Sequence, residues 1–260
     1  MMRALILICV ILVGLASNAL CKPLINKAVG AWLFDEGAGE DVRDGTPHEN
    51  HGRLKSEAAW VDGKFGTAVE FDGEEDYVDV PDSASLNITE AITIVMWAKR
   101  NTTSNDDHER AVIKGSKGEP GAYALSVRLG RFHFGVHVDG RWHFSDRETW
   151  RDTDWHHVAG TYDSVTKEYN LYKDGVNVHR RVLDGLKKYR IDTVKDDLAI
   201  GRWAFERKYF NGTLDEVGIF NEALSEKTIN EIMTNGLQDV LAIAPSGKLA
   251  VVWGKIKTQE

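Results

Sequence analysis

The sequence is poor in cysteine and in long hydrophobic runs, and each shortage excludes a class of protein. Its 260 residues include two cysteines, Cys9 and Cys21, both at the N-terminal end, so a disulfide framework cannot hold the fold together. Beyond residue 21 no apolar run is long enough to cross a bilayer. Acidic side chains outnumber basic ones by 40 to 32, and the resulting charge of −8 makes nucleic acid and anionic membranes poor partners.

The N-terminal segment predicts export from the cytoplasm. An apolar run at residues 4–15 follows the positive charge of Arg3, and small residues come next. This pattern is typical of a signal peptide at residues 1–21 that is cleaved near Ala19 or Cys21. A retained membrane anchor, the alternative, would need a longer apolar run. We therefore expect a secreted or extracytoplasmic protein that is not inserted in a membrane after cleavage.

Most of the remaining chain alternates apolar and polar residues with a period of two, which indicates β-strands. The alternation is clearest at residues 93–98, 132–138 and 155–162. Asp-Gly pairs, which favour tight hairpin turns, separate such segments and begin at residues 44, 62, 72, 139, 174 and 184. The pattern predicts an all-β sandwich of antiparallel sheets.

The C-terminal region departs from this pattern. Ser225 can cap a short helix that Asn235 and Gly236 would end. Residues 237–260 then carry two apolar runs around a Pro-Ser-Gly turn, which predicts a β-hairpin tail packed on its own domain or on another chain. After the signal peptide, we expect one β domain at residues 22–236, followed by this tail.

Four blocks in order resemble the laminin-G-like jelly roll of the concanavalin A-like lectin/glucanase superfamily. They are Gly30–Gly37, Gly63–Gly73 continuing into Asp76–Val80, Trp155–Tyr162 with Leu171–Gly175, and Tyr209–Val217. The resemblance extends from residue 29 to residue 235. It implies two curved antiparallel sheets packed face to face, in exported modules that bind carbohydrates or proteins, often with calcium.

An acidic residue on a predicted apolar strand face suggests where an ion would bind. Strand alternation places Asp215 with Val217 and Ile219, and a carboxylate there must be neutralised, hydrogen-bonded or bound to a cation. Asp44 and Asn50 match an acidic loop of the resembled family, and first and last strands of a jelly roll can lie side by side. We therefore predict that Asp44, Asn50 and Asp215 bind a structural calcium ion. The alternative is that Asp215 accepts backbone hydrogen bonds and binds no metal.

A candidate ligand platform follows from the Asp-Gly pair at residue 139. If this pair forms a two-residue turn, His137 pairs with Trp142 and Gly135 with Phe144. The face that bears these residues is opposite the apolar face of residues 132–138. His137, Trp142 and Phe144 could thus stack against a sugar, contact a protein, or be covered by a loop.

The enzymatic alternative depends on the sequence Glu70-Phe-Asp-Gly-Glu74. In laminarinase-type glycosidases of the resembled superfamily, a Glu-x-Asp-x-Glu strand carries the nucleophile and the general acid, and Glu70 and Glu74 match those positions. However, Asp72-Gly73 is a turn signal that would place the two glutamates on either side of a hairpin corner. We therefore expect no catalytic activity.

The sequence is best interpreted as a secreted, non-catalytic binding module for a carbohydrate or an extracellular protein, stabilised by calcium. Two other classes remain open. One is a laminarinase-type glycoside hydrolase that uses Glu70 and Glu74. The other is a structural or adhesive protein that binds other proteins through the apolar C-terminal tail.

Overall fold

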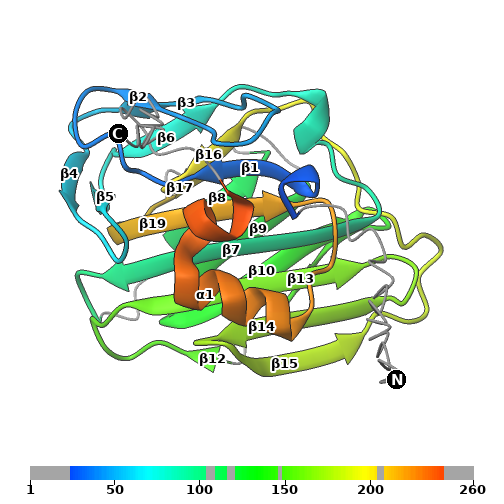
Figure 1. The fold of residues 1–260 in the computed structure, drawn as a ribbon. Coiled ribbons are helices and arrows are strands. Elements are labelled where there is room, and N and C mark those ends of the chain that lie inside the picture. Colours follow the sequence, from blue (N-terminus) through cyan, green and yellow to red (C-terminus); the bar gives the residue numbers. More distant parts are fainter. Residues whose placement is uncertain (1–23, 104–108, 116–120, 146–147, 204–207, 243–260) are drawn as a thin grey trace, which may run out of the picture.

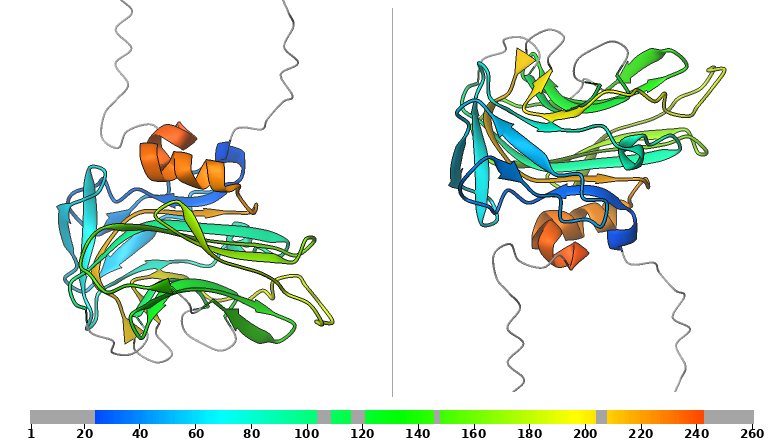
Figure 2. Two further views of the ribbon diagram at one scale, coloured as in Figure 1. Left: turned by 90° about the horizontal axis from the view of Figure 1, so that it is seen from below. Right: turned by 90° about the horizontal axis from the view of Figure 1, so that it is seen from above.

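In the part of the chain that the structure describes, the protein is a sandwich of two large antiparallel β-sheets with one α-helix outside them (Figure 1). The computed structural model describes residues 24–103, 109–115, 121–145, 148–203 and 208–242. Figure 2 shows the two sheets stacked as layers, with the helix on the outer side of one of them. The all-β sandwich with a short C-terminal helix predicted from the sequence is confirmed.

The sheet beneath the helix, here called sheet A, is formed by strands from distant parts of the chain. Its order is β15 (Val176–Val182), β14 (Glu168–Lys173), β13 (His156–Asp163), β7 (Ala91–Arg100), β19 (Asn211–Phe220), β5 (Thr67–Asp72) and β4 (Ala59–Asp62), and β1 (Ala28–Trp32) pairs with β19 outside this path. The pairing of β1 with β19 confirms that the first and last strands lie side by side.

The second sheet, here called sheet B, lies on the far side from the helix. Its order is β11 (Arg141–Phe144), β10 (Arg131–Val138), β9 (Tyr123–Arg128), β8 (Glu109–Lys114), β16 (Leu198–Ile200), β6 (Tyr77–Val80), β3 (Gly52–Lys55) and β2 (Asp41–Val42), and β12 (Glu148–Thr149) also pairs with β10. The small elements are β17 (Arg202–Trp203) paired with β18 (Lys208–Tyr209), and the 3-10 turns η1 (Leu24–Asn26) and η2 (Ala84–Leu86).

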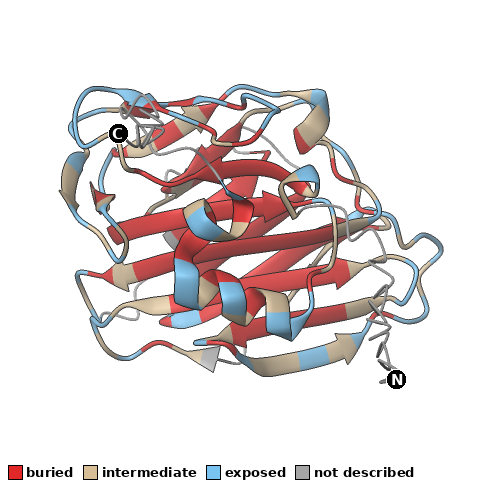
Figure 3. Ribbon diagram, viewed as in Figure 1, coloured by how far each residue is buried: buried red, intermediate tan, exposed pale blue. Residues whose placement is uncertain are grey.

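The core lies between the sheets and follows the predicted alternation. Strand β7 contributes Ile92, Ile94, Met96 and Ala98, and β10 contributes Phe132, Phe134, Val136 and Val138. All eight side chains are fully buried. Figure 3 shows the same result, with buried strands in the centre and exposed residues in loops and on the outer side of α1. Burial of this apolar surface is the main driving force for folding.

The helix α1 (Glu226–Leu241) begins where the sequence predicts, because the Ser225 hydroxyl accepts a hydrogen bond from the backbone N–H of Thr228. Ile229 and Ile232 are buried in a second apolar cluster, against the outer face of sheet A. Within the described residues, no helix is long and apolar enough to cross a membrane.

The predicted β-structure after Gly236 is wrong for residues 237–241. Gly236 adopts a positive φ of 79°, which breaks the helical path, but a further helical segment follows and ends at Leu241, with Ala242 as its C-cap. Leu237 and Leu241 are buried in the same cluster as Ile232. Glycine adopts this positive φ without strain, and the chain changes direction there while its leucines remain packed on sheet A. The rest of the predicted hairpin, and the signal peptide at residues 1–21, lie outside the described residues.

Candidate functional site

The β10–β11 hairpin carries the predicted aromatic group on the outer face of sheet B. Asp139 and Gly140 form its turn with φ values of 54° and 74°, as a type I′ turn requires. His137 pairs with Trp142 and Gly135 pairs with Phe144, as predicted. The structure therefore places His137, Trp142 and Phe144 side by side on one face, here called the aromatic platform.

The rings of the aromatic platform contact one another directly. Trp142 and Phe144 are stacked, with ring centroids 5.0 Å apart and an interplanar angle of 16°. His137 meets Trp142 edge-on at 5.6 Å. Gly135 makes room for this arrangement, because a Cβ atom there would lie 2.3 Å from the Phe144 ring. Trp142 and Phe144 are only partly buried, whereas His137 is buried.

Asp192 fixes the histidine of the platform and the hairpin turn together. Its Oδ2 atom lies 2.9 Å from His137 Nδ1 and accepts a hydrogen bond from Gly140 N at 3.0 Å. A ring held through Nδ1 has one orientation, so the platform is preorganised. Sequence reasoning did not find Asp192, because it follows the hairpin by about 50 residues and no local pattern connects them.

Arg110 and Trp203 extend this face beyond the platform. The Arg110 guanidinium lies 5.6 Å from the Phe144 ring and 4.7 Å from the Trp203 ring, and it donates a hydrogen bond to Ser126 Oγ at 2.9 Å. Trp203 packs with Ile113, Ala124, Ala199 and Trp142 in a small apolar cluster. Both Arg110 and Trp203 are buried, so these apolar and cation–π contacts support the platform and add little exposed surface to it. Trp203 was missed because β17 is too short to show a strand period.

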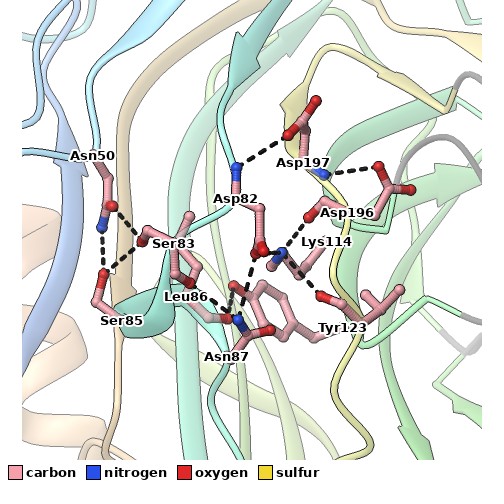
Figure 4. Close-up of polar contacts among 11 residues, drawn as sticks. Asn50, Asp82, Ser83, Ser85, Leu86, Asn87, Lys114, Tyr123, Asp196 and Asp197 are labelled. Atoms are coloured by element: carbon pink, nitrogen blue, oxygen red, sulfur yellow. Dashed lines mark hydrogen bonds and ion pairs between the residues drawn. The ribbon is translucent and has the colours of Figure 1, made fainter.

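Asp44 and Asn50, two of the predicted calcium ligands, do lie together. The Asp44 carboxylate accepts four hydrogen bonds, which come from Ala31 N, Thr46 N, Thr46 Oγ1 and Asn50 N. The Asn50 side chain donates to Val29 O. It also donates to Ser85 Oγ and accepts from Ser83 Oγ (Figure 4). Both residues are buried. Their polar atoms therefore connect β1, the loop before β3 and the segment around η2.

Asp215 does not lie with Asp44 and Asn50, and the prediction that it shares a strand face with Val217 and Ile219 is wrong. A β-bulge separates Asp215 from Gly218, and Glu216 within it has a φ of 52°. The additional residue reverses the alternation. Val217 and Ile219 therefore face the core, whereas Asp215 pairs with Trp97 on the helix side of sheet A.

One oxygen of the Asp215 carboxylate is satisfied in another way, whereas the other, Oδ1, is buried without a hydrogen-bond partner among the described residues. Its Oδ2 atom accepts hydrogen bonds from the backbone N–H groups of Lys64 and Phe65 at 2.7 and 2.9 Å. Burial, and then the charge of Glu216, raise the pKa of Asp215 to about 8. Glu216 itself accepts a hydrogen bond from Leu237 N, and burial raises its pKa to about 7. The two acids thus attach the loop before β5 and the end of α1 to β19.

These contacts do not fit a calcium ion bound by Asp44, Asn50 and Asp215. The four hydrogen bonds to Asp44 use the lone pairs that a cation would need. Asp215 shares no hydrogen-bond partner with the other two residues. In the described parts of the chain, no group of three or more His, Cys, Asp or Glu side chains is arranged to hold a metal.

We therefore expect the same melting temperature in excess calcium and in EDTA. A calcium ion bound only to the folded state would add about 2.7 kcal/mol of stability at a hundredfold excess over Kd, a shift that scanning calorimetry readily detects. Stabilisation by calcium that is lost in Asp44→Ala would restore the predicted site.

A buried cation of the protein itself occupies one oxygen-rich position in sheet B. Lys114 is fully buried, and its Nζ donates to Asp82 Oδ1 at 2.5 Å, to Val194 O at 3.2 Å and to Asp196 O (Figure 4). Asp197 supports the arrangement by accepting a hydrogen bond from Asp82 N. Buried ammonium groups require such partners. Lys114 therefore ties the loops beside η2 and before β16 to β8.

The candidate glycosidase residues are separated by a turn, as expected. Glu70 lies within β5, whereas Glu74 is exposed in the turn before β6, where its N–H donates to Asp72 Oδ1 at 2.7 Å. The expected hairpin corner is wrong, however, because β5 belongs to sheet A and β6 to sheet B. The Asp72-Gly73 turn carries the chain from one sheet to the other. Glu70 accepts a hydrogen bond from Asn101 Nδ2.

The two stacked antiparallel sheets and their strand order define a lectin-like jelly-roll sandwich. The family model described as the concanavalin A-like lectin/glucanases superfamily matches residues 72–230, so the chain belongs to this superfamily. No curated protein matches the sequence.

Solved structures with the same fold include three domains named for binding or solved with a bound saccharide. The binding domain of Paraclostridial Mosquitocidal Protein 1 is 16% identical, with a TM-score of 0.65 over 80% of this chain and 52% of that one. Domain 4 of AbnA, a GH43 extracellular arabinanase from Geobacillus stearothermophilus, was solved in complex with arabinotriose. It is 19% identical, with a TM-score of 0.63 over 79% of this chain and 98% of that one.

The receptor binding domain of botulinum neurotoxin C/D mosaic serotype is 14% identical, with a TM-score of 0.64 over 81% of this chain and 51% of that one. The chain thus spans about half the length of the two toxin domains but nearly the whole of the arabinanase domain. At these identities the likeness shows the fold.

Proposed function

We propose that the protein is a secreted, non-catalytic binding module that binds a glycan on the aromatic platform. The observation that carries this proposal is the stacked, partly exposed pair of Trp142 and Phe144 on the outer face of sheet B. A sugar ring presents an apolar C–H face that packs well on aromatic rings, while its hydroxyls need nearby polar groups. His137 and Arg110 are polar residues that contact this pair on the same face, although both side chains are buried.

The comparisons support a glycan as the ligand. The arabinanase domain, which matches over nearly its full length, was solved with arabinotriose. Another structural match, covering 51% of its chain, comes from work on a botulinum neurotoxin whose cell entry depends on ganglioside molecules. The N-terminal apolar segment and its small residues support secretion.

An extracellular protein is the second candidate ligand, because an aromatic surface with an arginine also suits a protein interface. Hydrolysis is less well supported. Retaining glycosidases need two carboxyl groups about 5 Å apart across a substrate cleft, whereas a turn between two sheets separates Glu70 from Glu74.

A glycan array tests the proposal directly. The purified mature protein should bind a restricted set of glycans, equally well with and without EDTA, and should release no reducing ends from the glycans that it binds. Protein in which Trp142 is replaced by alanine serves as the control for non-specific adsorption. Binding of no glycan by the folded protein would contradict the proposal, and turnover that is lost in Glu70→Gln would establish the enzymatic alternative.

A further inference from the structure

A cavity opens beside the aromatic platform, between the edges of the two sheets. Strand β11 is an edge strand of sheet B, and β15 is an edge strand of sheet A, visible at the lower edge of Figure 1. The space between them has a volume of about 410 Å³. It is lined by Arg141, Trp142 and His143 from β11, by Arg181 and Val182 from β15, and by Leu183, Asp184 and Leu186 from the following loop. We call it the edge cavity.

Two arginines give the edge cavity positive charge. Within the described residues, neither Arg141 nor Arg181 has a carboxylate at ion-pair distance, and the Nε and Nη2 atoms of Arg181 are buried without a hydrogen-bond partner. The Arg181 guanidinium lies 4.8 Å from the Tyr169 ring, which fixes its position. Two arginines that line one cavity without a carboxylate partner create a local positive potential. The cavity therefore favours an anionic group.

The neighbouring residues do not cancel this positive charge. Burial, and then the charges of Arg141 and Arg181, hold the pKa of His143 below its usual value despite a hydrogen bond to Val138 O. Asp184, the acid of the cavity, pairs with Lys167 at 3.4 Å. The segment of residues 180–190 contains five arginines and lysines and one aspartate, in a chain with a net charge of −8.

The size and lining of the edge cavity suit an organic anion better than a simple ion. Its volume lies in the range of small-molecule sites. Val182 is half exposed and Leu186 is partly buried, so the arginines have an apolar wall beside them. Trp142 belongs both to the cavity and to the aromatic platform. A ligand on the platform can therefore extend over β11 and place a charged substituent near the arginines.

We propose that the edge cavity receives the oxyanion of an acidic saccharide that lies on the aromatic platform. The inference rests on the proposed glycan-binding function. Arginine forks pair with either the carboxylate of a uronic acid or a sulfate ester. Both substituents present several acceptor oxygens to the guanidinium groups that line the cavity.

Calorimetric titration with matched oligosaccharides tests the inference. The ligands are oligogalacturonides, sulfated galactose oligosaccharides and neutral galactose oligosaccharides of equal length. The proteins are the native chain, the double variant Arg141→Gln/Arg181→Gln, and Arg190→Gln. Arg190 is a matched control, because it belongs to the same basic segment but pairs with Glu90 at 2.6 Å. Arg141→Gln alone is the second variant, since Arg141 is exposed and its loss should leave folding unchanged.

We expect one of the acidic ligands to bind the native chain more tightly than the neutral ligand. The double variant should lose about tenfold in affinity for it, since hydrogen bonds to charged groups contribute on this scale. Arg141→Gln should lose part of that affinity, and Arg190→Gln should change it by less than about twofold. The acidic ligand that depends on the arginines identifies the substituent as carboxylate or sulfate.

Equal binding of the acidic ligands to the native chain and the double variant would overturn the inference, as would neutral ligands that bind as tightly as acidic ones. Failure of the proposed function gives a different result. In that case Trp142→Ala leaves saccharide binding unchanged, whatever the arginine variants do. If no saccharide binds the folded native chain, both proposals are wrong.

Discussion

Replacing Asp44 by alanine should lower the free energy of unfolding by about 3 kcal/mol or more. The substitution removes a buried carboxylate that accepts four hydrogen bonds, three from backbone N–H groups and one from the Thr46 hydroxyl. These donors would remain buried without partners, because β1 and the surrounding loop leave little access for water. Urea denaturation of the folded protein measures the change.

Asp41→Ala is the matched control for this experiment. Asp41 lies three residues away in β2, and its side chain is exposed. Its replacement should change the free energy of unfolding by less than about 0.5 kcal/mol. Asp44→Asn should fall between the two, because asparagine keeps one acceptor oxygen. Similar stabilities of the Asp44→Ala and Asp41→Ala variants would show that the hydrogen bonds to Asp44 do not hold the sandwich together.

Replacing Trp142 by alanine should weaken glycan binding by about 30-fold, the effect expected when a central aromatic contact worth about 2 kcal/mol is removed. The variant loses the stacking partner of Phe144 and the edge contact to His137. Calorimetry with the strongest ligand from the array gives the ratio of dissociation constants.

Trp60→Ala is the control for the loss of a tryptophan. Trp60 lies on β4 of sheet A, is partly buried, and donates a hydrogen bond to Gly39 O at 2.9 Å. It should bind the glycan as the native chain does. A loss of affinity in Trp60→Ala equal to that in Trp142→Ala would contradict the assignment of glycan binding to the aromatic platform.

Features that depend on neighbouring residues were predicted correctly from the sequence. The period of two identifies both inner faces, because alternate residues of a strand point to the same face. The Asp139-Gly140 turn sets the register of the β10–β11 hairpin, since its two positive φ values allow one pairing. The platform residues follow from that register. The Ser225 cap likewise marks the start of α1 through a local hydrogen bond.

Features that depend on tertiary contacts were not predicted. The bulge at Glu216 is stabilised by the contact of its carboxylate with Leu237 N, and nothing in the strand sequence reports that partner. The Asp72-Gly73 turn has the composition of a hairpin turn but joins two different sheets. The partners of Lys114 and Arg110 come from distant segments. The type of a side chain indicates which kind of partner it requires, such as a hydrogen-bond acceptor or an aromatic ring. The fold determines which residue provides that partner.

Chemical-shift mapping of the isotope-labelled protein, with the strongest glycan ligand, tests the central claim most directly. We expect the largest changes at the Trp142 indole N–H and at the backbone amides of β10 and β11, with α1 and the outer face of sheet A unaffected. Changes confined to α1 or to the loops around Asp44, with Trp142 unchanged, would contradict the assignment of the binding site to the aromatic platform.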